Sequence, residues 1–285
     1  MINLMIGGAV KHKSSILTFI LKNKNMCKNI HITVYDGFEG CSWNGGRINR
    51  ENISLTDKEI ELYYNHGINI ALTFSNKDID LNDEIGNYLL KKFHKNGNKI
   101  ILTNLELNDY IKINYPLYET IFSITGLGDL NIPMTDQDVE KYKKLETLCD
   151  FIVPRMEHIF DEKFIELTQN KYEIMLNDTC IYKCPYYKEH FELIAKQNKT
   201  KNPWKTIGHH ECFKIEECWI NGFDPNIGHI ETKEKYGDNY GMDLTIKQVN
   251  KLKERGVMSF KITGRENSSD DIINELNKYL KVISC

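Results

Sequence analysis

The stretch Tyr172–His190, YEIMLNDTCIYKCPYYKEH, contains a strand, a loop and the start of a helix. Three apolar residues form the strand, and the polar turn Asn177–Thr179 ends it. Pro185 disfavours helix for the residue before it but is tolerated in the first turn of a helix, so a helix can begin there. Cys180 and Cys184 lie in the loop between these elements. We therefore expect two thiols at one strand end.

The same order of apolar strand, loop and amphipathic helix recurs along the chain. Helical crossovers between successive strands imply a parallel sheet. Eight such units predict an α/β fold, a (β/α)8 TIM-type barrel, with a doubly wound open sheet as the main alternative. The expected strands are 2–6, 32–35, 70–74, 99–103, 120–124, 151–154, 173–176 and 259–262. The expected helices are 14–25, 57–66, 82–96, 106–114, 136–148, 161–169, 186–197, 244–255 and 269–281.

Local signals mark where several of these helices begin and end. A threonine or serine stands three residues before an acidic residue at three helix starts, which is a capping pattern. Glycines stand where helices should stop and lead into strands. The predicted caps are Thr56, Thr135 and Ser268, and the predicted stops are Gly67, Gly97 and Gly256.

Composition excludes several classes of protein. A content of 41% hydrophobic and 27% charged residues is ordinary for a soluble globular chain, and no apolar run approaches the roughly 18 residues that span a bilayer. The first ten residues lack the long apolar region of a signal peptide, so we expect a cytoplasmic protein. A net charge of −3 gives no electrostatic case for a nucleic-acid surface. We predict one domain over 1–285, in which 198–243 is an elaborated loop over the C-terminal face of the barrel, before the last helix–strand unit.

In both candidate folds, functional groups collect at the carboxyl ends of the strands. We therefore expect the polar and special residues that follow the predicted strands to face one mouth. These are Asp36, Cys41, Trp43, Asn44, Arg47, Asn76, Asn104, Thr125, Gly126, Arg155, Glu157, His158, Asn177, Asp178, Cys180, Cys184, Thr263, Gly264 and Arg265.

Four cysteines form the predicted metal site: Cys180, Cys184, Cys212 and Cys218, with Cys41 as an alternative fourth ligand. Clustered cysteines in a chain without a secretory signal favour metal binding over disulfides. Four thiolates can hold either tetrahedral zinc or an iron–sulfur cluster. The spacing within each pair is not that of an ordinary zinc ribbon. From the residues alone, both zinc and an iron–sulfur cluster stay possible.

The segment Asp243–Arg265, DLTIKQVNKLKERGVMSFKITGR, resembles the terminal helix–strand signature of the collagenase-like peptidases, family thirty-two of the peptidases of unassigned mechanism. Upstream, Phe151–Glu157 and Glu173–Cys180 resemble two further strands of that family in the same order. The resemblance implies a barrel with a 4Fe–4S cluster. Family members include prephenate-dependent tRNA hydroxylases and proteins of anaerobic quinone-precursor hydroxylation. Thr263 stands where the family usually has glutamate.

Two further departures from the family concern the substrate. The glycine-rich insertion of larger members is absent between Cys180 and Cys184, and the chain has no room for the additional C-terminal domains of RNA-modifying members. We therefore expect a small anionic or biosynthetic substrate rather than tRNA.

The first hypothesis is an iron–sulfur enzyme that carries out oxygen-independent hydroxylation or related redox or oxygen-transfer chemistry. Arginine and lysine orient carboxylate or phosphate groups, and carboxylates transfer protons. The predicted catalytic residues are Arg155, Lys261 and Arg265 for orientation, and Glu157 and Asp178 for proton transfer. The predicted substrate-binding residues are Asn76, Asn177, Arg47 and His190.

Two alternatives belong to other functional classes. A peptidase would need one nucleophilic thiolate with a base, for which Cys180 and His190 are the candidates. His209, His210 and Glu211 do not form the HExxH motif of a metallopeptidase. The other alternative is a zinc-stabilised, non-catalytic partner subunit, which would work as one half of a heterodimer or homodimer.

Overall fold

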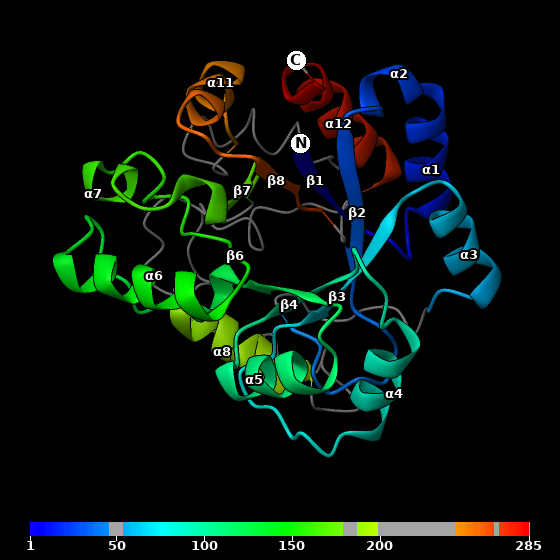
Figure 1. The fold of residues 1–285 in the computed structure, drawn as a ribbon, viewed down its shortest axis with the longest axis horizontal. Helices are drawn as coiled ribbons and strands as arrows, with labels where there is room; N and C mark the ends of the chain where they lie inside the picture. The colour runs from blue at the N-terminus through cyan, green and yellow to red at the C-terminus, as the bar shows by residue number, and fades with distance from the viewer. Residues whose placement is uncertain (46–53, 179–186, 199–242, 265–267, 285) are drawn as a thin grey trace.

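The structure is a computed structural model that describes residues 1–45, 54–178, 187–198, 243–264 and 268–284. Within these residues, eight parallel strands form a nearly closed barrel with helices around it (Figure 1). The TIM-type barrel predicted from the sequence is therefore confirmed. The strands are β1 (Ile2–Gly7), β2 (Ile30–Asp36), β3 (Asn69–Phe74), β4 (Lys99–Leu102), β5 (Glu119–Phe122), β6 (Phe151–Ile152), β7 (Glu173–Met175) and β8 (Ser259–Ile262).

Closure of the barrel is thinnest between β6 and β7. The hydrogen-bonded order runs β6-β5-β4-β3-β2-β1-β8-β7, so β6 and β7 are the two ends of the sheet. One isolated parallel bridge, between Ile152 and Tyr172, joins these ends. On its other side, β7 pairs with β8 along its whole length. The strand that leads to the cysteine segment is therefore attached mainly through β8.

Helices form where the sequence predicts them, and their ends follow the predicted signals. Thr56 and Thr135 each form a reciprocal capping box, and Ser268 and Asp271 bond each other's backbone N–H groups. Gly67 and Gly256, directly after the C-caps His66 and Arg255, have φ of 70° and 92°, the left-handed conformation that ends a helix. Gly97, with φ of 89°, lies in a turn beyond the helix before it, which already ends at Lys92. The helices are α1 (Lys13–Lys22), α2 (Lys24–Cys27), α3 (Asp57–Asn65), α4 (Glu84–Lys92), α5 (Leu105–Asn114), α6 (Asp136–Leu148), α7 (Glu162–Ile165), α8 (Tyr187–Asn198), α11 (Ile246–Glu254) and α12 (Ser269–Ser284).

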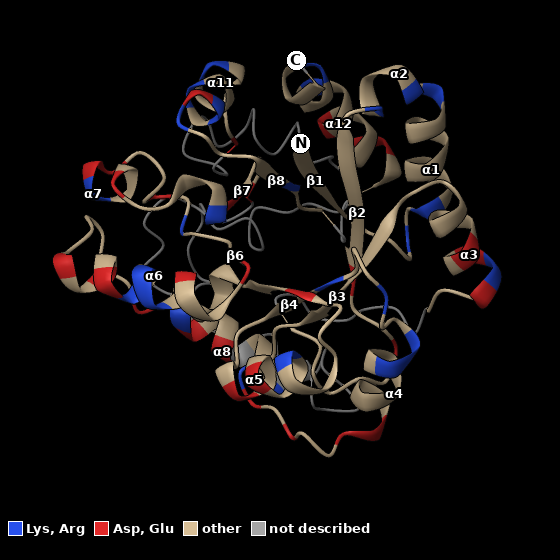
Figure 2. Cartoon of the chain, viewed as in Figure 1, with Lys and Arg blue, Asp and Glu red and all other residues tan. Residues whose placement is uncertain are grey.

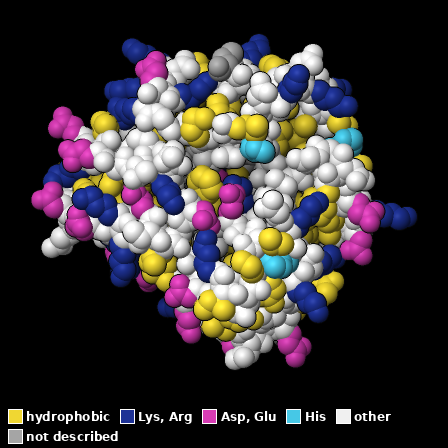
Figure 3. All heavy atoms as spheres, in the orientation of Figure 1, with side chains coloured by type: hydrophobic (Ala, Val, Ile, Leu, Met, Phe, Trp, Pro, Cys, Tyr) yellow, Lys and Arg dark blue, Asp and Glu magenta, His cyan; other side chains and the backbone are white. Residues whose placement is uncertain are grey.

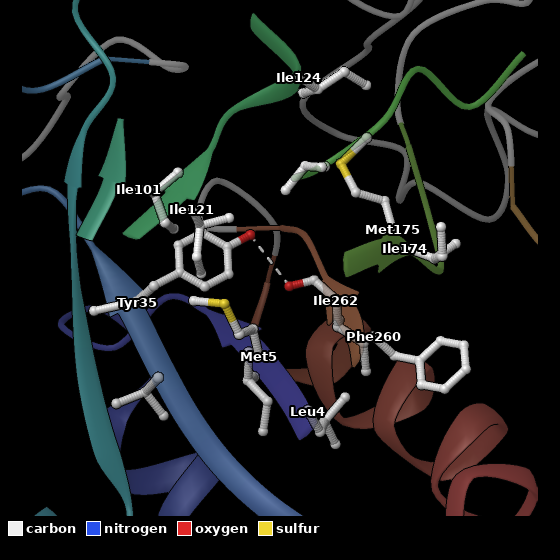
Figure 4. Packing of buried hydrophobic residues seen from close by; sticks show 14 of the residues in the cluster. Leu4, Met5, Tyr35, Ile101, Ile121, Ile124, Ile174, Met175, Phe260 and Ile262 are labelled. Atoms are coloured by element: carbon white, nitrogen blue, oxygen red, sulfur yellow. Dashed lines mark hydrogen bonds between the residues drawn. The ribbon is translucent and has the colours of Figure 1, made fainter. Parts of the chain in front are cut away.

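Alternate residues of the strands face the barrel lumen. Figure 4 shows Met5, Tyr35 and Met175 turned toward a common centre, whereas Ile174 and Phe260 point outward. The Tyr35 hydroxyl of β2 donates to the Ile262 carbonyl of β8 at 3.3 Å, although β1 lies between these two strands in the sheet. This alternation decides which polar side chains of the strands end up inside the barrel.

The outer surface carries charges of both signs. Figure 2 shows basic and acidic residues interspersed over the surrounding helices, and Figure 3 shows the same face as a mixture of apolar and charged side chains. The face viewed has no broad field of one sign, in keeping with the net charge of −3. In the described part of the chain, no helix is long and apolar enough to cross a membrane.

The cap of α6 gives a first prediction. The Asp138 carboxylate accepts hydrogen bonds from the Thr135 backbone and hydroxyl, and from Asn131. Burial pushes the pKa of Asp138 upward, but these hydrogen bonds hold it below its ordinary value. Asp138→Ala should therefore lower the free energy of unfolding by about 1–2 kcal/mol near neutral pH.

The sign of the pH dependence follows from the lowered pKa of Asp138. Its contribution is present above the unfolded-state pKa of about 3.9 and is lost as the pH falls through the lower folded-state value. Urea unfolding of both proteins at about pH 7 and pH 3 measures it, and the difference should shrink at the lower pH. Asp136→Ala, on the same turn but exposed, is the matched control and should change little. A constant difference at both pH values would contradict the prediction.

Candidate functional site

Asn177 and Thr263 clamp the carboxyl ends of β7 and β8 together. The Thr263 N–H donates to Asn177 Oδ1 at 2.7 Å, and Asn177 Nδ2 donates to the Thr263 carbonyl at 3.2 Å. The Thr263 hydroxyl donates to the Asn177 carbonyl at 3.0 Å. Asn177 lies at the predicted mouth, but both ends of its amide bond protein atoms. Its observed role is therefore to fix the point from which the cysteine segment departs.

Asn76, after β3, is an anchor for α8. Its Nδ2 donates to the Ser42 carbonyl at 3.1 Å and to the Ala195 carbonyl at 3.0 Å, and its Oδ1 accepts from the Asp78 N–H at 3.1 Å. The side chain is fully buried. Binding of substrate by Asn76 stays a prediction, since both Nδ2 hydrogens are already bonded within the protein.

Helix α8 packs against the loops at the carboxyl ends of β3, β5 and β6. Besides the bond from Asn76, Lys77 Nζ lies 3.6 Å from Glu192 Oε1. A Cβ at Gly128 would lie only 3.0 Å from Lys188 Cα, so glycine allows the close approach of α8. In Figure 1, α8 lies below β6, well away from α11.

The spans of α8 and α11 agree with the helices predicted over 186–197 and 244–255. As predicted, α11 directly precedes β8, and it packs on α12. Because α11 occupies that place, α8 is available to cover strand ends.

Arg155 and Glu157, two predicted catalytic residues, form a buried bidentate ion pair. Arg155 Nη2 donates to Glu157 Oε1 at 2.8 Å and Arg155 Nε donates to Oε2 at 3.2 Å. Their side chains are 3% and 1% exposed. The guanidinium carbon lies 4.3 Å from the ring centre of Tyr187 at the start of α8. The charge of Arg155 is thus neutralised within the protein.

His158 is a satisfied core histidine. Its Nε2 lies 2.8 Å from the Asn131 carbonyl, which can only accept, so Nε2 carries the proton. Its Nδ1 then accepts from the Tyr142 hydroxyl at 3.0 Å. Burial lowers the pKa of His158. A neutral imidazole with both nitrogens bonded positions the loop after β6 and is not available for proton transfer.

Lys261 lies inside the barrel lumen. Its Nζ is 3.7 Å from Glu173 Oε1 and 4.3 Å from the ring centre of Tyr35, a cation–π geometry. Burial raises the pKa of Glu173, although Lys261 and Lys99 oppose that shift. Sequence reasoning missed Glu173 and Tyr35. For Glu173, the signal that could have revealed it is its charge at an inward-facing position of the otherwise apolar strand β7.

Cys41 is the one predicted metal ligand within the described residues. Its thiol is buried, and burial raises its pKa to about 12. Across the described ranges, no three His, Cys, Asp or Glu side chains gather as a metal ion would require. Asp178 and His190 are buried, and the His190 ring stacks on Phe191. The other predicted site residues lie outside the described residues and stay predictions: Cys180, Cys184, Cys212, Cys218, Arg47 and Arg265.

Comparison with known proteins bears on the fold. No family model and no curated protein matches the sequence. Among solved structures, the chain is similar to the U32 peptidase Mk0906, with a TM-score of 0.51 over 94% of this chain and 95% of that one. The two chains share a barrel fold. Identity is 10%, so the likeness concerns architecture. It supports the U32-like fold that Asp243–Arg265 implied.

Proposed function

We propose that the chain is an enzyme whose reaction takes place at the carboxyl-end mouth of the barrel, with a 4Fe–4S cluster held by Cys180, Cys184, Cys212 and Cys218. The reaction is oxygen-independent hydroxylation or related redox or oxygen-transfer chemistry on a small anionic substrate. Lys261 supplies positive charge for that substrate.

The observation that carries the proposal is that both ends of the segment with Cys180 and Cys184 are fixed at the mouth. Asp178, next to the clamped Asn177, is 5% exposed, and Tyr187, against Arg155, is 3% exposed. The described residues on either side of the two cysteines in the sequence therefore lie at the carboxyl-end mouth with Thr263, which supports a role for these thiols there.

The donor set suits an iron–sulfur cluster. Four thiolates are its usual ligands, and a bound cluster supplies one-electron transfer or, with an open iron, a Lewis acid. Cys41 is buried among core residues, and we keep Cys218 as the fourth ligand with Cys41 as its alternative. The other roles fall to the protein: Lys261 attracts an anion, and α8 excludes water from the strand ends it covers.

Metal analysis tests the proposal. Protein purified without oxygen should be brown, absorb near about 400 nm and contain about four irons per chain. Cys180→Ser and Cys184→Ser should each lose the absorbance and most of the iron. Cys27→Ser is the matched control, because Cys27 lies at the opposite end of the barrel in α2, and it should keep both. Colourless protein with zinc would contradict the proposal and favour the partner-subunit alternative.

A peptidase is the second candidate, and the structural similarity to a U32 peptidase favours it. Its nucleophile would be Cys180 with His190 as the base. His190 is 5% exposed in α8, so α8 would have to present it to the thiolate. Hydrolysis of a quenched-fluorescence peptide library by the iron-free protein, abolished by Cys180→Ser, would support this reading. A brown protein without peptide hydrolysis would exclude it.

A further inference from the structure

The barrel lumen contains a carboxylate, Glu173, and an ammonium, Lys261, that form a loose ion pair. The 3.7 Å between Lys261 Nζ and Glu173 Oε1 exceeds the length of a charge-assisted hydrogen bond. Glu173 Oε1 is buried and has no hydrogen-bond partner. Glu173 Oε2 has only the Ser259 hydroxyl, at 3.4 Å. The carboxylate is fully buried, so it bears a desolvation cost that its partners offset incompletely.

The groups around this pair come from several strands. Lys261 and Ser259 are on β8, and Lys99, which also acts on Glu173 electrostatically, is on β4. Lys99 already has its own counter-ion, because its Nζ lies 2.6 Å from Glu119 Oε2 on β5. Tyr35 of β2 presents its ring to Lys261. Glu173 therefore depends on Lys261 for its charge balance.

We propose that Lys261 recognises a small carboxylate in the barrel lumen, and that this anion replaces Glu173 as a counter-ion of the ammonium while Glu173 takes up a proton from solvent. Two carboxylates beside one ammonium in a region of low dielectric cannot both stay ionised. The buried one protonates, because burial already disfavours its charged form. The balance is one anion bound and one proton gained by the protein. This inference rests on the anionic-substrate part of the proposed function and makes Glu173 a positioning residue.

Calorimetric titration with oxalate tests the coupling, since oxalate is small and stays ionised between about pH 6 and 9. Comparing two buffers of different ionisation enthalpy counts the protons taken up. Wild type should take up close to one proton per oxalate, and its affinity should fall by up to about tenfold per pH unit where Glu173 is ionised. Glu173→Gln keeps the shape and should bind oxalate without proton uptake. Lys261→Met should not bind it.

Glu119→Gln is the matched control, because it neutralises the half-exposed counter-ion of Lys99 and leaves Glu173 and Lys261 in place, and it should keep the proton uptake. A carbon-13 spectrum of the Glu173 carboxyl in wild type gives a readout that needs no variant: oxalate should shift it to the protonated position. Oxalate binding without proton uptake, uptake that survives Glu173→Gln, or no binding by wild type up to about 10 mM would each overturn the proposal. Iron content is measured separately, so the oxalate titration can be interpreted even if the protein proves to hold no iron–sulfur cluster.

Discussion

Replacing Glu157 with alanine should lower the free energy of unfolding by about 3–5 kcal/mol, because it leaves the buried Arg155 guanidinium without the carboxylate that neutralises it. The bidentate geometry and the low exposure of both side chains place this pair in the buried class of ion pairs, for which removal of one partner is costly. Because Arg155 also faces Tyr187, the change should loosen the start of α8. Urea unfolding at neutral pH measures the effect.

The control for Glu157→Ala is an exposed pair on the outer surface. Glu140 Oε1 lies 2.9 Å from Lys143 Nζ, and both side chains are more than half exposed, so Glu140→Ala should change the free energy of unfolding by less than about 1 kcal/mol. Equal effects of the two substitutions would show that the pair beneath Tyr187 is not structurally important. If the Glu157→Ala protein were stable but inactive, the result would instead support the predicted role of Glu157 in proton transfer.

Trp43→Ala should be comparably destabilising, by about 3–5 kcal/mol. Trp43 is completely buried, and its ring centre lies 5.1 Å from that of Phe74 in a T-shaped arrangement. Its Nε1 donates to the Asp80 carbonyl at 2.8 Å. A Cβ at Gly86 would lie 2.4 Å from the ring, so α4 approaches the indole through a glycine. The Trp43 carbonyl also accepts from the Asn76 N–H, which connects this packing to the residue that anchors α8.

Thermal unfolding followed by circular dichroism compares Trp43→Ala with Tyr88→Ala, a large aromatic residue on the exposed side of α4. Tyr88 is 60% exposed, so its removal should leave the midpoint within about 2 °C of wild type. A small shift for Trp43→Ala would mean that the loop after β2 contributes little to the barrel.

The barrel could be predicted because its signals are local. Each predicted strand is a largely apolar run of four or five residues in the sequence, and capping residues and glycines delimit several of the helices between them. The place of α8 could not be predicted, because it depends on a hydrogen bond between Asn76 and Ala195, which are 119 positions apart. The open-sheet alternative fails at the Ile152–Tyr172 bridge, another contact that no local pattern encodes.

The positions of Asn177 and Arg155 after their strands could be predicted, but the partners that they bond could not. Residue type and position after a strand placed Asn177 and Arg155 at the mouth, where they are found. The partners of these side chains come from tertiary contacts, so the sequence could not show that the amide of Asn177 is used by Thr263, or that Arg155 is neutralised. Glu173 was overlooked because its strand was treated as uniformly apolar, although alternation along β7 turns it inward.

The thin junction between β6 and β7 has a mechanical consequence. Since β7 pairs along its length with β8, and the Asn177–Thr263 clamp joins the two strand ends, these two strands form one hydrogen-bonded unit beside that junction. Lys261 belongs to this unit, so we expect the separation between its ammonium and Asn177 to stay nearly constant if the barrel opens between β6 and β7.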